Sequence, residues 1–93
     1  MYRIKESKKE EIKEYRTNYY VEKTGLTQPY VSGIVNGTQK CTEIIAKALL
    51  SVKFDISFYD TRLNELVKKY FEEEWANGQK RIFDSKRNVK QNQ

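Results

Sequence analysis

The stretch that decides the fold is residues 17–40, which reads TNYYVEKTGLTQPYVSGIVNGTQK. Two short segments with helical spacing of apolar residues are separated by three residues that begin with Gly25. Glycine is typical of the position after a helix C-terminus, because it adopts the left-handed backbone conformation without strain. The second segment has Thr27 as its cap, Pro29 in its first turn and a turn signal at Gly37. The pattern therefore predicts two helices joined by a tight turn.

The second of these helices, residues 27–36, has two different faces. Val31, Ile34 and Val35 form one narrow apolar stripe, and the residues opposite are small and polar. A helix with a narrow buried stripe leaves its other face free to enter the major groove of DNA. Gln28 lies on that free face, and a glutamine side chain can bond both N6 and N7 of adenine.

This stretch resembles the lambda-repressor-like helix-turn-helix of Cro and phage-repressor (XRE-like) proteins. Members commonly read EKTGLSQ, then VS or IS, then IENG, where residues 22–37 read EKTGLTQPYVSGIVNG. The resemblance extends over about residues 8–56. It implies a small transcriptional regulator of phage or mobile-element type. Such a protein binds double-stranded DNA sequence-specifically, as a homodimer, with residues 27–36 in the major groove.

The resemblance also implies roles for individual residues. Five positions match those that face base edges: Thr27, Gln28, Pro29, Ser32 and Gly33. Five others match phosphate-contact positions: Thr17, Asn18, Asn36, Thr38 and Lys40. The buried framework matches Val21, Leu26, Val31 and Ile34.

The chain departs from the family at two places, and these keep a second function open. Tyr20 and Val21 stand where the family usually has small residues, and no charged residue occurs from Gln28 to Gly37. A recognition helix without arginine or lysine also suits a protein-interaction module on the same fold, such as an antitoxin, an antirepressor or an inhibitor of host defence.

Several residues in and near this stretch fit more than one role. Gly33 fits either a close approach to DNA or tight packing against the preceding helix. The tyrosines at 19, 20 and 30 are expected to pack structurally rather than stack on unpaired bases. Cys41 is expected to be a small, partly buried residue rather than a reactive thiol. We interpret the run Glu72-Glu73-Glu74 as a solvated helix face.

The rest of the chain predicts three more helices. Ser7 and Glu10 form a capping box for a first helix through about residue 16, with Ile12 and Tyr15 inward. Thr42 caps a core helix, Asp60 or Thr61 caps a last one, and Asn77-Gly78 ends it. The core helix has these apolar positions: Ile44, Ile45, Ala48, Leu49 and Val52. An extended link with alternating Phe54, Ile56 and Phe58 joins it to the last helix.

The last helix has an apolar stripe with two interpretations. Either it closes the domain's own core, or it pairs with the same stripe of a second copy, and part of it can do each. A homodimer would place two reading helices one turn of DNA apart. The stripe consists of Leu63, Leu66, Val67, Tyr70, Phe71 and Trp75.

Composition places these elements in a small single core. The chain has 93 residues, of which 38% are hydrophobic. We expect an all-α fold, a compact bundle of about five helices that contains the helix-turn-helix. The expected boundaries are a helix-turn-helix domain at 1–58, a C-terminal amphipathic helix at 59–78, and a basic tail at 79–93.

Composition also argues against whole classes of function. The chain has no histidine and one cysteine, so Ser–His and Cys–His nucleophiles and His-containing zinc sites are excluded. We therefore expect no enzyme activity, no metal or cofactor and no small-molecule substrate. No apolar run approaches the roughly 18 residues of a membrane-spanning helix, and we expect a cytoplasmic protein that does not bind membranes.

The distribution of charge points to a polyanionic partner. The net charge is +5, and it is concentrated at the two ends of the chain. Residues 1–40 carry eight Lys and Arg against five Asp and Glu, residues 41–79 carry five against seven, and residues 80–93 carry five against one. A basic tail is usually disordered, but it can also contact the DNA backbone. Its cations are Lys80, Arg81, Lys86, Arg87 and Lys90.

Overall fold

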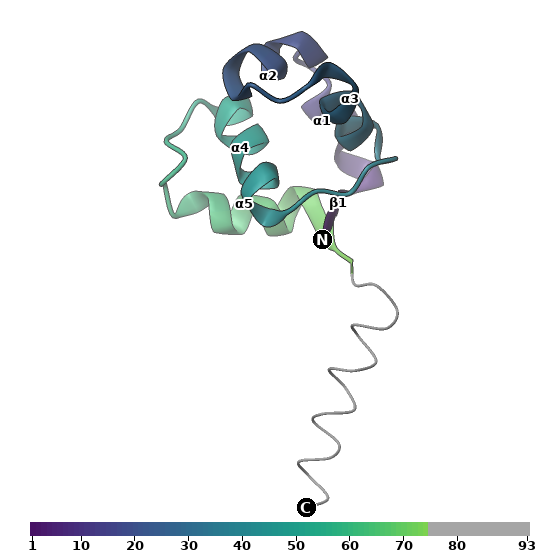
Figure 1. Cartoon of the computed structure of the whole chain (residues 1–93). Coiled ribbons are helices and arrows are strands. Elements are labelled where there is room, and N and C mark those ends of the chain that lie inside the picture. Colours follow the sequence, from purple (N-terminus) through teal and green to yellow (C-terminus); the bar gives the residue numbers. More distant parts are fainter. Residues whose placement is uncertain (75–93) are drawn as a thin grey trace, which may run out of the picture.

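The buried apolar side chains form one core to which segments from Ile4 to Phe71 contribute. The computed structural model describes residues 1–74, and its fold is mostly helical with one small sheet (Figure 1). The elements in chain order are β1 (Tyr2–Ile4), a 3-10 turn (Glu6–Lys8), α1 (Lys9–Ile12), α2 (Thr17–Thr24), α3 (Gln28–Asn36), α4 (Glu43–Phe54), α5 (Arg62–Tyr70) and β2 (Phe71–Glu73).

The helix ends of the middle of the chain follow the signals in the sequence. Gly25 ends α2 with φ +79° and Gly37 ends α3 with φ +84°, both in the left-handed region that glycine tolerates. The Thr42 side chain accepts the Ile45 N–H at 3.3 Å and so caps α4. These predicted boundaries are confirmed.

The first helix is much shorter than predicted. α1 covers only Lys9–Ile12 after the 3-10 turn, and Ser7 lies inside that turn rather than at a cap. Ile12 is buried as expected, but Tyr15 is 40% exposed. A helix with a single buried residue gains little from burial, and short helices are marginal without it.

The core helix is placed correctly, although its buried face differs from the prediction. Leu49 is buried as expected, together with Ala46 and Leu50, whereas Ile44 is 65% exposed. Ile44 lies two residues, or about 200° of helix rotation, from buried Ala46, which puts it on the opposite face. Phe54 is the last residue of α4, so the predicted extended link does not begin there.

The expectation of an all-α fold is wrong at the two ends of the described chain. The last helix ends at Tyr70, and the chain continues as β2, which pairs antiparallel with β1. Ile4 faces Phe71 in this register, and both side chains are buried in the core. The strand partner lies almost 70 residues away, so no local pattern predicts the pairing. Trp75, Asn77-Gly78 and the tail 79–93 lie outside the described residues.

Candidate nucleic-acid interface

The turn between α2 and α3 is held by a set of short hydrogen bonds. The Gly25 N–H donates to the Val21 carbonyl at 2.8 Å. The Thr24 hydroxyl donates to the Tyr20 carbonyl at 2.7 Å and accepts the Leu26 N–H at 3.2 Å. Leu26 is partly buried against the core, as is Val21. The turn therefore fixes the direction in which α3 leaves α2.

Tyr20 anchors α2 to the rest of the core. Its ring is fully buried, and its hydroxyl donates to the Ile12 carbonyl at 2.7 Å. Burial raises the pKa of this hydroxyl well above its ordinary value, so the group stays a neutral donor. Tyr20 therefore links α2 to α1 through its hydrogen bond to Ile12.

α3 buries one face and leaves the other open, as the sequence predicts. Val31, Ile34 and Val35 are buried in the core. Among the predicted base-facing residues, Thr27, Gln28 and Pro29 are exposed, and Ser32 and Gly33 are half-buried. The structure thus brings these five residues together along one side of α3.

Gly33 is covered by the chain that follows α3 rather than by α2. A Cβ at this position would lie 2.9 Å from the Cβ of Gln39. The Gly33 carbonyl accepts the N–H groups of Thr38 at 2.9 Å and Gln39 at 3.1 Å. The glycine therefore lets residues 38–39 fold back over the last turn of α3.

The predicted phosphate contacts lie at the two ends of this region. Thr17 and Asn18 open α2, with Thr17 half-buried and Asn18 exposed. Asn36 is the last residue of α3, and Thr38 and Lys40 lie in the segment that follows the helix. Some of their donors already have partners: the Asn36 amide donates to the Ser32 carbonyl at 2.9 Å, and the Thr38 hydroxyl donates to the Gly33 carbonyl at 3.3 Å.

Residues that the sequence reasoning missed hold the segment 37–41 in place. The backbones of Tyr2 and Cys41 exchange two hydrogen bonds of 2.7 and 2.8 Å. The Arg3 guanidinium donates to the Gly37 carbonyl and, through Nε, to Glu74 Oε2 at 3.0 Å. No signal near 37–41 indicates this support, because it comes from both ends of the described chain.

The Glu74 carboxylate pairs with both Arg3 and Lys40. Its other carboxylate oxygen lies 3.6 Å from Nζ of Lys40. The hydrogen bond from Arg3 and the two nearby positive charges lower the pKa of Glu74. Glu72 and Glu73 are exposed as predicted, although they lie in a strand rather than a helix, while Glu74 is half-buried. Part of the charge of Lys40 is therefore already neutralised.

The single cysteine, Cys41, is more deeply buried than the sequence predicts. Cys41 is fully buried, and burial raises the pKa of its thiol to about 11. A thiol in this state is a poor nucleophile at neutral pH. Among residues 1–74, no three His, Cys, Asp or Glu side chains come together in a way that suits a metal ion. None of the helices in this range is long and apolar enough to cross a bilayer.

The predicted stripe of the last helix closes the core of the chain itself. Leu63, Val67, Tyr70 and Phe71 are each at most 3% exposed. Leu66 is partly buried and remains accessible at the surface. Most of the stripe is therefore already covered in the single chain.

Comparison with known protein families, curated proteins and solved structures found no match to this chain. The case for a function therefore depends on the residues and their arrangement.

Proposed function

We propose that this chain is a small DNA-binding transcriptional regulator with a helix-turn-helix formed by α2, the turn 25–27 and α3. The observation that carries the proposal is the division of α3 into a buried apolar face and an open, uncharged polar face. That division, together with the resemblance of residues 22–37 to the lambda-repressor-like family, supports entry of α3 into the major groove.

The polar face offers few groups that can read bases. Gln28 is exposed in the first turn of α3, where a bidentate contact to adenine discriminates by about 1–3 kcal/mol. Ser32 is a weaker candidate, because its hydroxyl oxygen already accepts the Asn36 amide at 3.3 Å. We therefore expect few direct contacts to bases. The remaining specificity would come from DNA shape, and phosphate contacts from the ends of α2 and α3 would add affinity.

The test is selection of DNA fragments from a genomic library that includes the flanks of the chain's own gene. The wild-type chain is expected to retain a palindromic site, and Gln28→Ala/Ser32→Ala is expected to lose that selectivity. Asn64→Ala is a matched control, because Asn64 is an exposed polar residue of α5. Equal, non-selective binding by all three proteins would contradict the proposal.

A protein-interaction role on the same fold is the second candidate. It is favoured by the absence of charge from Gln28 to Gly37 and by the pairing of Lys40 with Glu74. On this alternative, Gln28→Ala leaves every DNA interaction unchanged but weakens binding to a protein partner.

A further inference from the structure

The side chains of Arg3 and Lys40 meet at one carboxylate, although they lie far apart in the sequence. Arg3 belongs to β1, and Lys40 lies in the segment that follows α3. Their neighbours Tyr2 and Cys41 exchange two backbone hydrogen bonds of 2.7 and 2.8 Å, which hold the two cations next to each other. Arg3 Nε lies 3.0 Å from Glu74 Oε2, and Lys40 Nζ lies 3.6 Å from Glu74 Oε1. The fold thus builds a place for one anion between two cations.

The Arg3 guanidinium is already oriented in the free chain. Through a second nitrogen it donates to the Gly37 carbonyl at the end of α3. Lys9 packs against the same glycine, since a Cβ at Gly37 would lie 2.9 Å from the Lys9 ammonium nitrogen. The carbonyl groups at a helix C-terminus carry partial negative charge, which favours cations there. A guanidinium that is held in this way loses little entropy when it binds an anion.

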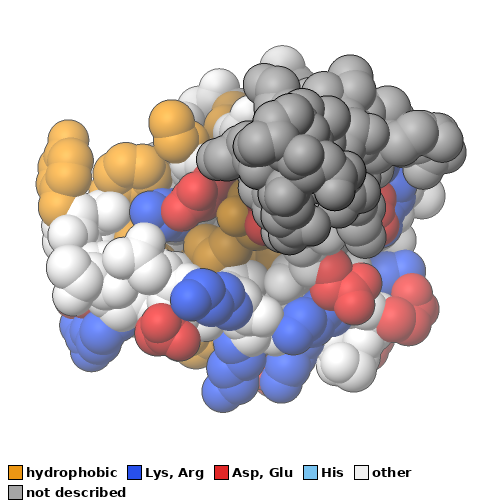
Figure 2. Space-filling model, turned by 90° about the horizontal axis from the view of Figure 1, so that it is seen from below, with side chains coloured by type: hydrophobic (Ala, Val, Ile, Leu, Met, Phe, Trp, Pro, Cys, Tyr) orange, Lys and Arg blue, Asp and Glu red, His pale blue; other side chains and the backbone are white. Residues whose placement is uncertain are grey.

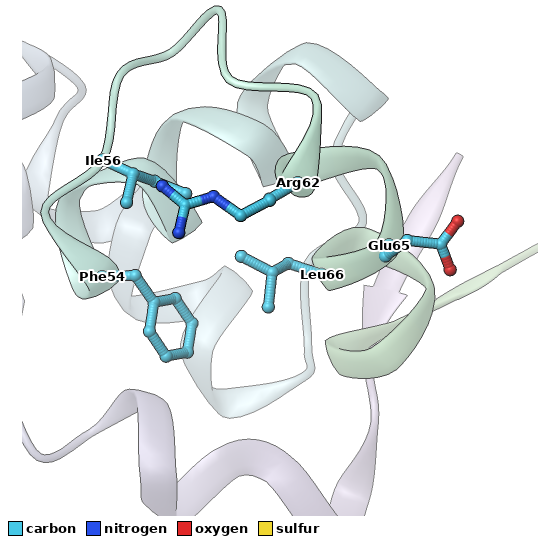
Figure 3. A pocket seen from close by; sticks show the side chains of 5 residues that line it. All are labelled: Phe54, Ile56, Arg62, Glu65 and Leu66. Carbon is cyan, nitrogen blue, oxygen red and sulfur yellow. The ribbon is translucent and has the colours of Figure 1, made fainter.

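A different guanidinium shows an ordinary local ion pair in the same chain. Arg62 reaches over the apolar pocket between α4 and α5 toward Ile56 (Figure 3). The Asp60 carboxylate holds it with three hydrogen bonds of 2.7 to 3.1 Å. Within residues 1–74, no second lysine or arginine pairs with Asp60, so this pair is neutral. The Glu74 carboxylate has two cations, and its group therefore keeps a net positive charge.

The backbone of Glu74 is fixed, but its carboxylate is open to solvent. The Glu74 N–H donates to the Met1 carbonyl at 2.6 Å, at the end of the β1–β2 pair. The side chain is 33% exposed. In Figure 2, in which this end of the molecule is turned toward the viewer, basic and acidic side chains lie next to one another at the surface. Rotation of the Glu74 side chain alone therefore uncovers both cations and leaves the sheet unchanged.

We propose that Arg3 and Lys40 form a binding site for one phosphate group, and that the Glu74 carboxylate occupies this site as an internal competitor. The oxygens of a phosphate suit the guanidinium as those of a carboxylate do. An arriving phosphate takes the place of the carboxylate, which turns into solvent. The family resemblance implies a phosphate contact for Lys40 but neither Arg3 nor a competitor. That the phosphate belongs to a DNA backbone rests on the proposed function, whereas phosphate binding itself does not.

The tethered carboxylate determines which phosphates can enter the site. A group on the same chain competes at an effective concentration of about millimolar. A free phosphate has to overcome this competition by its own concentration. A phosphate that other contacts already hold beside the site has a similar advantage of proximity. The site therefore stays occupied by Glu74 until a docked ligand presents a phosphate to it.

The experiment is a titration of the isotope-labelled full chain with inorganic phosphate at constant ionic strength, without DNA. NMR signals of Arg3 Nε and of the Lys40 amide report on the site. We expect weak binding by the wild type and about tenfold tighter binding by Glu74→Gln, because a charge-assisted competitor is lost. Glu73→Gln is the matched control, since it changes the net charge equally at an exposed position of β2 and leaves the affinity unchanged.

Removal of the cations tests the composition of the site. Arg3→Gln/Glu74→Gln and Lys40→Gln/Glu74→Gln are each expected to lose the tenfold gain. The Lys40 variant keeps the contact of Arg3 with the end of α3, so its result holds even if the Arg3 variant disturbs folding. Arg62→Gln/Glu74→Gln is the control for loss of a cation elsewhere, and it keeps the gain.

Three results would overturn the inference. The first is a failure of Glu74→Gln to bind phosphate more tightly than the wild type. The second is an equal gain in Glu73→Gln, because net charge and not the site would then decide. The third is a gain that persists without Lys40.

A second titration, with a DNA duplex of random sequence, identifies the source of the phosphate. If the DNA backbone supplies it, the duplex shifts the Arg3 Nε signal as inorganic phosphate does, and Gln28→Ala/Ser32→Ala retains this shift. An Arg3 signal that responds to inorganic phosphate but not to the duplex would overturn the assignment to DNA. Failure of the proposed function is distinct, because it is measured as loss of site selectivity at Gln28 and not as loss of phosphate binding.

Discussion

The space beside Gly33 is filled by the chain itself, which changes how this residue is understood. The resemblance of residues 22–37 to the lambda-repressor-like family predicts that Gly33 faces DNA, while the sequence alone also allowed a packing role. The nearest neighbour of an added Cβ is nevertheless Gln39, whose Cβ would lie 2.9 Å away. The need for glycine therefore follows from the path of residues 38–39, whether or not DNA approaches.

Replacement of Gly33 by alanine tests this reason. Alanine gains about 1 kcal/mol from helix propensity, but overpacking costs about 1–3 kcal/mol when a close neighbour cannot move freely. We expect Gly33→Ala to lower the free energy of unfolding by about 1 kcal/mol in urea denaturation. Gly33→Ala/Gln39→Gly removes the close neighbour and is expected to recover part of that loss. A single variant more stable than the wild type would show that the space is free.

At the scale of elements, the β1–β2 pair does more than close the ends of the described chain. β1 exchanges hydrogen bonds with β2 along one edge, and its Tyr2 exchanges two more with Cys41 along the other. β1 therefore lies between the end of α5 and the segment that follows α3. This position explains why Ile4 is buried although it stands near the N-terminus.

Substitution of two isoleucines, one in β1 and one exposed on α4, tests how much the burial of β1 contributes to the free energy of unfolding. Ile4 is 3% exposed and Ile44 is 65% exposed. Because large-to-small changes in a core cost about 2–5 kcal/mol, we expect Ile4→Ala to lower the free energy of unfolding by that amount. Ile44→Ala is expected to stay within about 0.5 kcal/mol of wild type. Similar losses in the two variants would argue against the strand pairing.

The ion pair between Lys40 and Glu74 links the sheet to the proposed DNA contacts. The substitution Glu74→Gln removes the carboxylate that pairs with Lys40, so the Lys40 ammonium group becomes available to a DNA phosphate. We expect stronger non-specific DNA binding and a salt dependence steeper by about one unit of logarithmic slope. Affinity measured over a series of salt concentrations checks this.

Glu73→Gln is the matched control for that measurement. It makes the same change of net charge one residue away, at an exposed position of β2. If Glu73→Gln and Glu74→Gln steepen the salt dependence equally, the effect comes from net charge and not from release of Lys40. If Glu74→Gln weakens DNA binding, the main role of Glu74 is to hold segment 37–41 through Arg3.

For the whole molecule, the raised pKa values of a buried thiol and a buried tyrosine hydroxyl predict a loss of stability at alkaline pH. Burial raises the pKa of Cys41 to about 11, and burial together with a hydrogen bond to Glu11 raises that of Tyr70 to about 12. Their ordinary values are 9.0 and 10.0, so the folded chain holds both protons more tightly than the unfolded chain. The stabilisation is complete below about pH 9 and is lost as the pH rises toward 12.

Urea denaturation from about pH 8 to about pH 11.5 measures this loss, to which each group contributes a slope of at most about 1.4 kcal/mol per pH unit. Tyr70→Phe is expected to flatten the dependence above about pH 10. Tyr59→Phe, at an exposed position, is expected to leave it unchanged. Stability that does not vary over this range would contradict the prediction.

The sequence by itself determined the elements whose signals are local. Gly25 and Gly37 end α2 and α3, and Thr42 begins α4, because a left-handed glycine or a capping hydroxyl acts within a few residues. Thr27 precedes α3 as predicted, although its side chain makes no capping hydrogen bond. The buried and open faces of α3 follow from the helical spacing of its apolar residues Val31, Ile34 and Val35. Thr27, Gln28 and Pro29 are exposed and Ser32 and Gly33 are half-buried at and after the start of α3, and their role in DNA binding stays a prediction.

Only the tertiary structure decided the features that depend on distant partners. It shortened the first helix, because residues 13–16 find no core to face, and it ended α5 at Tyr70, because Phe71 pairs with Ile4. It also gave Lys40 a carboxylate partner in Glu74 and left the Tyr59 side chain 88% exposed. Long-range strand pairing and burial depend on what the whole chain brings together, and no local pattern encodes that.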